Sequence, residues 1–437
     1  MKIDRKELRE AVKIASKLTN GHGSFPILQC VFLDGPGQRL IATDLEIAVF
    51  APLEITDYTL TTEPEVIADD MLEGLKAQHL KEVASYFDVD LPGKKSTVPV
   101  MKEAILEKFR EEAQAGSVRE EQYCLNAADF GKILGTLDVD VVEISPASDA
   151  DGNGNLFGAN TSPRVKIGEN FHDLATYATD EFPMPVQEDT DAADLVTLTV
   201  PRKGLSDVAI AGNRDEDYGF KLNSLYFDLS DRENPSIVAT DGHRLHWTSL
   251  HGVDAPESVQ GFTVPLSVEK MLKAVFPKDD DVVSIEYCDK SVRIPFGEGG
   301  LLLVREPEGK FPDWKMVART ERDKSVTIAK EDMERPLRQA LAIAGADYRA
   351  FQMKFNGGID VEFTNPEKGA YQKISIPIKS KNYDDGEEFL IGINGKLVLD
   401  AMGPIDSEDL VIEFADATKP IYMGQEDYHS IVMPMRV

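Results

Sequence analysis

The chain repeats itself at two different spacings, and this repetition limits its fold more than any other feature. Two alternating apolar segments end in Ala-Thr-Asp, LIATDLE at 40–46 and IVATDGH at 237–243, and their aspartates are 197 residues apart. The related segments EFPMP at 181–185 and KFPDW at 310–314 are only 129 residues apart. An insertion of about 68 residues in the first copy accounts for the difference. We therefore predict three copies with a period near 130 residues.

Each copy contains two units in which a short strand runs directly into a helix. The first unit of each copy begins at residue 1, 196 or 325, and the second begins at residue 122, 261 or 389. The intervening segments alternate apolar and polar residues between Gly, Asp and Asn turns, as antiparallel strands do. Because each helix has one apolar face to pack on a sheet, we predict an α+β fold of three two-layer domains with two helices each.

The predicted domain boundaries follow from this period. The first domain covers 1–190 and carries the insert at about 57–120, the second covers 195–324, and the third covers 325–437. The insert is predicted to form two helices around the loop LPGKKSTVP. It resembles small helix–extended loop–helix modules that bind nucleic acid, so Lys94 and Lys95 are candidate phosphate contacts. A structural or protein-docking role explains the insert equally well.

The composition indicates a cytoplasmic protein. There is no apolar run of about 18 residues, and the charged start MKIDRKELREAV does not resemble an export signal. Cys30, Cys124 and Cys288 are far apart and lack CxxC spacing, which argues against a disulfide framework and a thiolate metal site. We therefore expect no cofactor and no bound metal.

The formal net charge of −30 opposes binding to nucleic acid unless cations gather on a few surfaces. The first predicted helix has such a surface, because its apolar residues share one side and Lys6, Arg9, Lys13 and Lys17 lie opposite, interrupted by Glu10. An ordinary solvated face is the alternative. Weaker versions of the pattern in the later copies comprise Arg202, Lys203, Arg214, Lys270, Lys273, Arg335, Arg338 and Lys396.

Three segments resemble the signature segments of the bacterial DNA polymerase III beta subunit, the beta sliding clamp. They are IVATDGHRLH at 237–246, KFPDW at 310–314 and IVMPMRV at 431–437, and the similarity covers the chain except about 57–120. The resemblance implies three DNA-clamp domains per chain and a head-to-tail homodimer, with sheets outside and helices lining a ring around duplex DNA. It also implies a non-catalytic processivity factor of a replicative DNA polymerase, with the cations listed above facing the DNA.

The resemblance further implies an apolar cleft that binds short linear peptides of the polymerase, the clamp loader and repair proteins. An apolar rim that includes flexible Met side chains suits varied peptides. The cleft residues carried over from the family are Leu222, Thr240, Gly242, His243, Arg244, Leu245, Pro312, Val317, Asn394, Ile431, Val432, Met433, Pro434, Met435 and Arg436.

Four positions depart from the family pattern. His22 stands where the family usually has an arginine near the DNA, so it is a candidate DNA contact that would depend on pH. Met316 replaces a basic residue beside the cleft, and Leu397 replaces an aromatic one, which predicts an altered peptide preference. Pro336 lies within a helical pattern and predicts that this helix starts late, so that the proline falls near its first turn.

Two other patterns have competing interpretations. DADGNG at 149–154 matches the first half of an EF-hand loop, but Asn160 stands at the twelfth position, and a Gly- and Asn-rich turn explains the same residues. Asp241 and His243, with Arg244 to stabilise an anion, would suit a hydrolase or nuclease acting on DNA. An Asp-Gly pair between strands is more simply explained as a hairpin turn.

Overall fold

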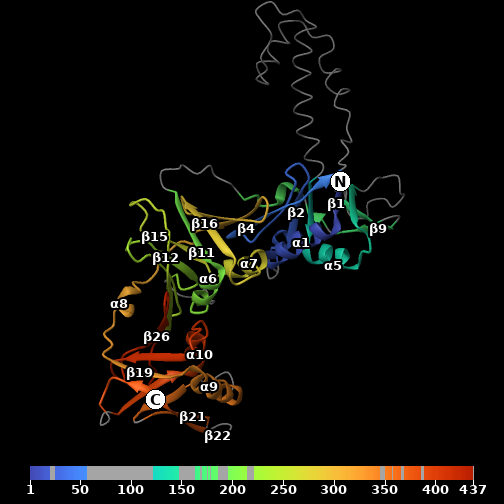
Figure 1. The fold of residues 1–437 in the computed structure, drawn as a ribbon. Helices are drawn as coiled ribbons and strands as arrows, with labels where there is room; N and C mark the ends of the chain where they lie inside the picture. The colour runs from blue at the N-terminus through green and yellow to red at the C-terminus, as the bar shows by residue number, and fades with distance from the viewer. Residues whose placement is uncertain are drawn as a thin grey trace, which may run out of the picture. The chain divides into compact units, whose positions relative to one another are not determined.

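The computed structural model describes residues 1–19, 25–56, 122–146, 163–167, 170–174, 176–177, 179–185, 195–213, 221–344, 350–356, 358–365, 369–384 and 388–436 (Figure 1). The chain divides into two compact units. The first unit is Met1–Val186 with Glu298–Leu301, and the second is Gln187–Gly297 with Leu302–Val437. Several predictions lie outside the described residues: the insert with Lys94 and Lys95, His22, Arg214, and the loop at 149–154 with Asn160.

All six predicted strand-to-helix units are present, which confirms this part of the sequence analysis. In each unit the helix begins within three residues of the end of its strand. The pairs are β1 (Lys2–Asp4) with α1 (Arg5–Thr19), β6 (Gln122–Asn126) with α5 (Ala127–Thr136), β11 (Val196–Pro201) with α6 (Arg202–Ala209), β15 (Gly261–Pro265) with α7 (Val268–Val275), β19 (Lys324–Ala329) with α9 (Lys330–Ala344), and β24 (Phe389–Asn394) with α10 (Gly395–Met402).

The first unit contains two runs of antiparallel strands. One has the order β5-β1-β7-β8-β9, and the other has the order β10-β6-β2-β3-β4. Helix α1 packs against β3, β4 and α5, and its buried side includes Leu8, Ala11, Val12 and Ala15, as the sequence predicted. The bounds are β2 (Cys30–Asp34), β3 (Arg39–Thr43), β4 (Ile47–Pro52), β5 (Ile55–Thr56), β7 (Val141–Pro146), β8 (Pro163–Ile167), β9 (Asn170–Asp173) and β10 (Thr176–Tyr177).

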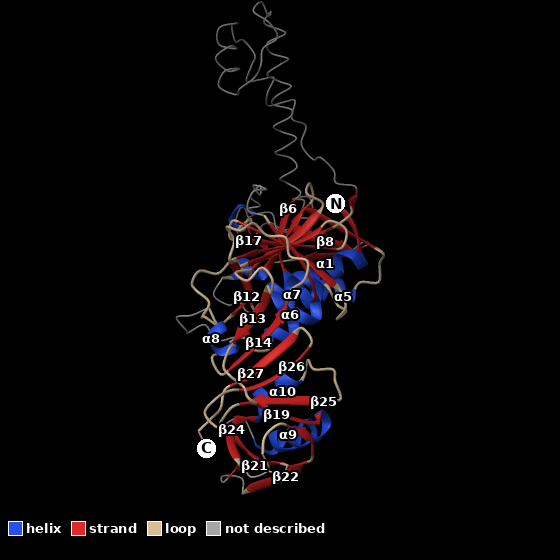
Figure 2. Cartoon of the chain, turned by 60° about the vertical axis from the view of Figure 1, so that its left-hand side comes forward, coloured by secondary structure: helices blue, strands red, loops and turns tan. Residues whose placement is uncertain are grey.

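A nine-stranded antiparallel sheet runs through the second unit and includes strands from both the 195–324 and the 325–437 segments. Its order is β15-β12-β13-β14-β27-β26-β25-β19-β23, and Figure 2 shows its middle strands side by side. The two segments meet where β14 pairs with β27, with Leu245 opposite Ile431. The bounds are β12 (Ser224–Asp228), β13 (Ser236–Thr240), β14 (Arg244–Ser249), β23 (Ile378–Lys381), β25 (Asp409–Phe414), β26 (Ile421–Gln425) and β27 (Tyr428–Val432).

Two smaller runs of strands complete the second unit. One follows the order β18-β17-β16-β11, and the other is the sheet β22-β21-β20-β24. The bounds are β16 (Val282–Cys288), β17 (Ser291–Phe296), β18 (Gly300–Arg305), β20 (Ala350–Phe355), β21 (Ile359–Asn365) and β22 (Ala370–Ile376), and a short helix α8 covers Lys315–Ala318. Among the described residues, no helix has the length and apolar content needed to cross a membrane.

The predicted late start of the helix around Pro336 is wrong. Helix α9 begins at Lys330, and Pro336 lies in its second turn. Proline has no backbone N–H, so the carbonyl of Asp332 loses its usual helical donor. The side chains of Met333, Leu337 and Ala340 are buried in one apolar core. This packing offsets the local cost of the proline, because tertiary burial outweighs helix propensity.

Candidate functional site

A rigid hairpin turn connects β13 to β14, and its residues are the Ala-Thr-Asp-Gly-His-Arg segment of the sequence. The Asp241 carboxylate accepts hydrogen bonds from the backbone N–H groups of His243, at 2.9 Å, and Arg244, at 3.0 Å. Gly242 has a φ of +84°, in the left-handed region that favours glycine. The Thr240 hydroxyl donates to the Arg244 carbonyl at 2.6 Å. The Asp-Gly hairpin expected from the sequence is therefore confirmed.

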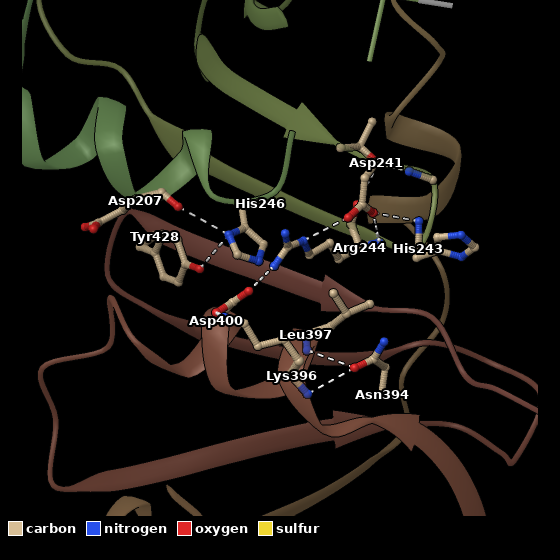
Figure 3. Close-up of polar contacts among 12 residues, drawn as sticks. Asp207, Asp241, His243, Arg244, His246, Asn394, Lys396, Leu397, Asp400 and Tyr428 are labelled. Atoms are coloured by element: carbon tan, nitrogen blue, oxygen red, sulfur yellow. Dashed lines mark hydrogen bonds and ion pairs between the residues drawn. The ribbon is translucent and has the colours of Figure 1, made fainter. Parts of the chain in front are cut away.

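Arg244 is held between two carboxylates. Its Nε donates to Asp241 Oδ2 at 3.0 Å, and its Nη1 donates to Asp400 Oδ2 at 2.6 Å (Figure 3). The Arg244 side chain is 11% exposed and the Asp400 side chain 17%, so both charges are largely removed from water. The Lys396 ammonium contacts the other Asp400 oxygen. This chain of ion pairs ties the hairpin turn to helix α10 of the next segment.

His246 makes a second connection between the two segments, two residues further along β14. Its Nδ1 lies 3.2 Å from the Asp207 carbonyl of α6 and 3.1 Å from Tyr428 Oη of β27. Tyr428 Oη donates to the Ala401 carbonyl of α10 at 3.2 Å, so we assign the imidazole proton to Nδ1. Burial lowers the pKa of His246 to about 4, and the ring is neutral near pH 7.

An apolar cluster covers the other face of β14, since successive side chains of a strand point to opposite sides. Leu245 and Ile431 are buried there with Val238, Phe311 and Trp314, and Val317 packs against them. Trp247 belongs to the same face and stacks on His429, with ring centroids 4.9 Å apart. The arrangement places the Phe311–Ala318 segment over the seam between β14 and β27.

Asp228 fastens the Phe311–Ala318 segment to β12. Its Oδ2 accepts a hydrogen bond from Trp314 Nε1 at 2.8 Å and lies 2.9 Å from Lys315 Nζ. Burial alone would raise the pKa of Asp228, but hydrogen bonds from Ser230, Lys315 and Trp314 hold it below its ordinary value. The carboxylate is therefore charged near pH 7 and fixes α8, which carries Met316 and Val317.

The segment after β27 runs past both the hairpin turn and β24. The Met433 N–H donates to the His243 carbonyl at 2.8 Å, and the Met435 N–H donates to the Gly392 carbonyl at 2.8 Å. Met433 and Pro434 are half-buried, and Met435 and Arg436 are exposed. Met316 is 76% exposed.

The two sides of the seam thus bring together many of the cleft residues predicted from the sequence. Asn394 caps α10 by accepting from the backbone N–H groups of Lys396 and Leu397, so it also has a structural function. Leu222 is half-buried before β12, and Pro312 is half-buried ahead of α8.

Val432 requires a correction, because its side chain does not line a surface. It is fully buried in the core of the 325–437 segment with Ile421 and Met423. Strand alternation explains this, since Ile431 faces the apolar cluster over the seam and its neighbour must point the other way. Val432 therefore contributes to packing.

Most of the predicted helix cations are exposed, including Lys6, Arg9, Lys13 and Lys17 on α1. In the second unit Lys203 is half-buried. The exposed cations there are Lys270, Lys273, Arg335, Arg338 and Lys396.

Arg202 requires a second correction. It is only 5% exposed. Its guanidinium donates to the Lys278 carbonyl at 3.0 Å and the Ser206 hydroxyl at 3.0 Å, and it pairs with Asp279. A guanidinium engaged in this way fixes the loop before β16 to α6 and is not presented to a phosphate.

The structure does not favour the hydrolase interpretation of Asp241 and His243. The hydrogen bond between these residues comes from the backbone N–H of His243, and the other Asp241 oxygen accepts from Arg244 (Figure 3). The carboxylate therefore serves the turn and the Arg244 side chain. Within the described part of the chain, no group of three or more His, Cys, Asp or Glu residues could hold a metal ion.

Comparison with known proteins finds similarity to bacterial beta sliding clamps. Residues 316–436 match the family model for the C-terminal domain of the DNA polymerase III beta subunit. The chain is 24% identical to the beta sliding clamp of Pseudomonas putida over 278 residues, which is 62% of this chain and 73% of the relative. It is 23% identical to that of Streptococcus pneumoniae over 259 residues, 57% of this chain and 66% of the relative.

The chain is similar in sequence to the bacterial beta sliding clamps and has their fold. The DNA polymerase III subunit beta of Pseudomonas aeruginosa matches with a TM-score of 0.70 at 20% identity, covering 100% of this chain and 99% of that one. The sliding clamp of Bacillus subtilis matches with a TM-score of 0.71 at 17% identity, covering 100% and 98%. The beta-clamp resemblance inferred from the sequence is thereby confirmed.

Proposed function

We propose that the protein is a DNA sliding clamp, a non-catalytic processivity factor that encircles duplex DNA and holds a replicative DNA polymerase on it in the cytoplasm. The observation that carries this proposal is the agreement of the clamp fold over the whole chain with the beta-subunit match at residues 316–436. The active form is a head-to-tail homodimer in which each chain contributes three clamp domains to a ring. Rings of this kind leave no strand edge unpaired at the subunit boundary.

The ring retains DNA by topology. Cations that contact phosphates without reading bases favour no register, so the ring can slide along the duplex. The proposed DNA-facing residues in the described chain are Lys6, Arg9, Lys13, Lys17, Lys203, Lys270, Lys273, Arg335, Arg338 and Lys396.

The seam between β14 and β27 is the proposed peptide cleft. The buried apolar cluster with Leu245 and Ile431 supports it, and its rim includes the exposed Met316 and Met435 and the half-buried Met433. Unbranched Met side chains adapt to different apolar anchors, so one cleft serves peptides of the polymerase, the clamp loader and repair proteins. Arg244 borders the cleft with its charge already balanced by Asp241 and Asp400.

Retention on DNA of different topology tests the ring directly. The protein is loaded by its clamp loader onto nicked circular DNA and separated from free protein by gel filtration. We expect it to stay on the circle and to run off after a restriction enzyme linearises the DNA. Equal retention on the circle and the linear product would rule out the topological mechanism, and a monomer by light scattering would rule out the homodimer.

Replacing Met433 with alanine tests the cleft. We expect peptide binding to weaken by about 1–3 kcal/mol, the range for an anchor side chain in a small desolvated pocket. The measurement is isothermal titration of the dimer with the clamp-binding peptide of its polymerase. Met184 is an exposed methionine of the first unit, so Met184→Ala is the matched control and should leave the affinity unchanged. Unchanged affinity in Met433→Ala would place the peptide elsewhere.

A further inference from the structure

The exposed cations of most helices pair with carboxylates on the same helix. Lys132 lies 3.0 Å from Asp129 on α5, and Lys203 lies 2.7 Å from Asp207 on α6. The same spacing of three or four residues joins Lys273 to Glu269, Arg335 to Glu331, Arg338 to Glu334, and Lys396 to Asp400. Residues at this spacing are neighbours on a helix surface, so each pair behaves locally as a dipole.

Helix α9 shows this balance of cations and carboxylates most clearly. Its three cations, Lys330, Arg335 and Arg338, stand against the three carboxylates of Glu331, Asp332 and Glu334. The helix therefore has no net side-chain charge at pH 7. Helix α10 is also balanced, with Lys396 and Asp400 as its charged residues.

Helix α1 is different. It contains five cations, Arg5, Lys6, Arg9, Lys13 and Lys17, and only two carboxylates. Of the carboxylates, Glu7 accepts a hydrogen bond from the Glu54 backbone N–H at 2.8 Å, and Glu10 pairs with Lys13 at 3.1 Å.

Four of the five α1 cations are exposed, and they lie opposite the buried side of the helix. Arg5 is the exception, because its guanidinium donates to the Leu137 carbonyl. The exposed face of α1 thus carries the largest surplus of positive charge among the described helices. Helix α7 has a surplus of one, because Glu269 balances Lys273 and leaves Lys270 as an extra exposed cation.

The surplus decides how strongly a helix attracts DNA. An exposed ion pair contributes little to stability, so a phosphate can displace the carboxylate as the cation's nearest partner. The carboxylate nevertheless stays within one helical turn and repels the same phosphate. At the distances over which DNA is attracted, the opposite charges of such a pair cancel. The net positive charge on the exposed face of α1 does not cancel.

We infer that helix α1 is the main element through which each chain attracts the phosphodiester backbone, and that acidic residues on the other described helices cancel most of the cations there. The inference rests on the proposed sliding-clamp function and assigns that attraction to one surface. Two α1 faces, one per chain, guide the duplex, and the cations of the other helices contribute less to its attraction. Retention then depends on ring closure and not on affinity.

Salt dependence of DNA binding distinguishes the two kinds of helix. Three double variants of the full chain are compared with the parent on a short duplex by fluorescence anisotropy: Arg9→Gln with Lys17→Gln, Arg335→Gln with Arg338→Gln, and Glu331→Gln with Glu334→Gln. The first two each remove two cations, so they are matched in charge. Light scattering confirms that each variant remains a dimer.

We expect the α1 variant to reduce the slope of log K against log salt by up to about 2, because each neutralised phosphate contributes about 0.9. The α9 arginine variant should reduce the slope by less than half as much, and the α9 glutamate variant should increase it. An equal loss in the two cation variants, or no gain in the glutamate variant, would overturn the inference. Failure of the sliding-clamp proposal would appear separately, as equal retention of the parent on circular and linear DNA.

Discussion

Replacement of Asp400 with asparagine should lower the free energy of unfolding of the second unit by about 3 kcal/mol, the lower end of the range for breaking a buried ion pair. The reason is that Arg244 would keep a largely buried positive charge with only Asp241 to balance it. Urea unfolding followed by tryptophan fluorescence measures the change. The two tryptophans of the chain, Trp247 and Trp314, both belong to the second unit, so the signal reports that unit alone.

Two further variants make this result specific. Asp409 pairs with Lys379 at the surface, with both side chains about half exposed, so Asp409→Asn should change stability far less than Asp400→Asn. The double variant Arg244→Met with Asp400→Leu removes both charges, and its cost should be clearly less than the sum of the single costs. If Asp400→Asn were as stable as Asp409→Asn, the ion pair would not hold the hairpin turn to α10.

Acidification should destabilise the second unit through His246. Its pKa is about 4 in the folded protein and near 6.5 in the unfolded chain, so the unfolded state takes up the proton first as the pH falls. The stabilisation is complete above about pH 6.5 and is lost between there and about pH 4. Linkage gives a loss of about 2 kcal/mol between pH 7 and pH 5 from this residue.

The measurement is the free energy of unfolding at pH 7 and at pH 5, in the parent and in His246→Asn. The variant should lose about 2 kcal/mol less on acidification than the parent, whatever its stability at pH 7. Identical pH dependence in the parent and His246→Asn would show that His246 is protonated equally in both states.

The local parts of the fold could be predicted from the sequence. Each strand-to-helix unit has its own change of apolar period and its own boundary, so no distant residue is needed to recognise it. The Asp-Gly hairpin at 241–242 is predictable for the same reason. The start of α9 was not, because the packing of Met333 and Leu337 outweighs the local signal of Pro336.

The errors and omissions at the candidate site come from contacts between distant residues. From the sequence alone Arg202 is predicted to be an exposed helix cation, because its partner Asp279 lies 77 residues later in the chain. Asp400 and Arg244 are 156 residues apart, and no local pattern joins them. The one available signal was the spacing of Lys396 and Asp400 on one helix, which indicates an ion pair there but not the contact of Asp400 with Arg244. His246 could have been noticed as a histidine between two large apolar residues, Leu245 and Trp247.

The pairing of β14 with β27 has a consequence for synthesis of the protein on the ribosome. Leu245 and its partner Ile431 are separated by 186 residues. At about 5–20 residues per second, β14 is made roughly 10–40 s before the strand that covers it. During that interval its outer edge offers unpaired N–H and C=O groups to any other nascent strand. Conditions that slow translation between these strands should therefore increase aggregation of the newly made chain without changing the finished protein.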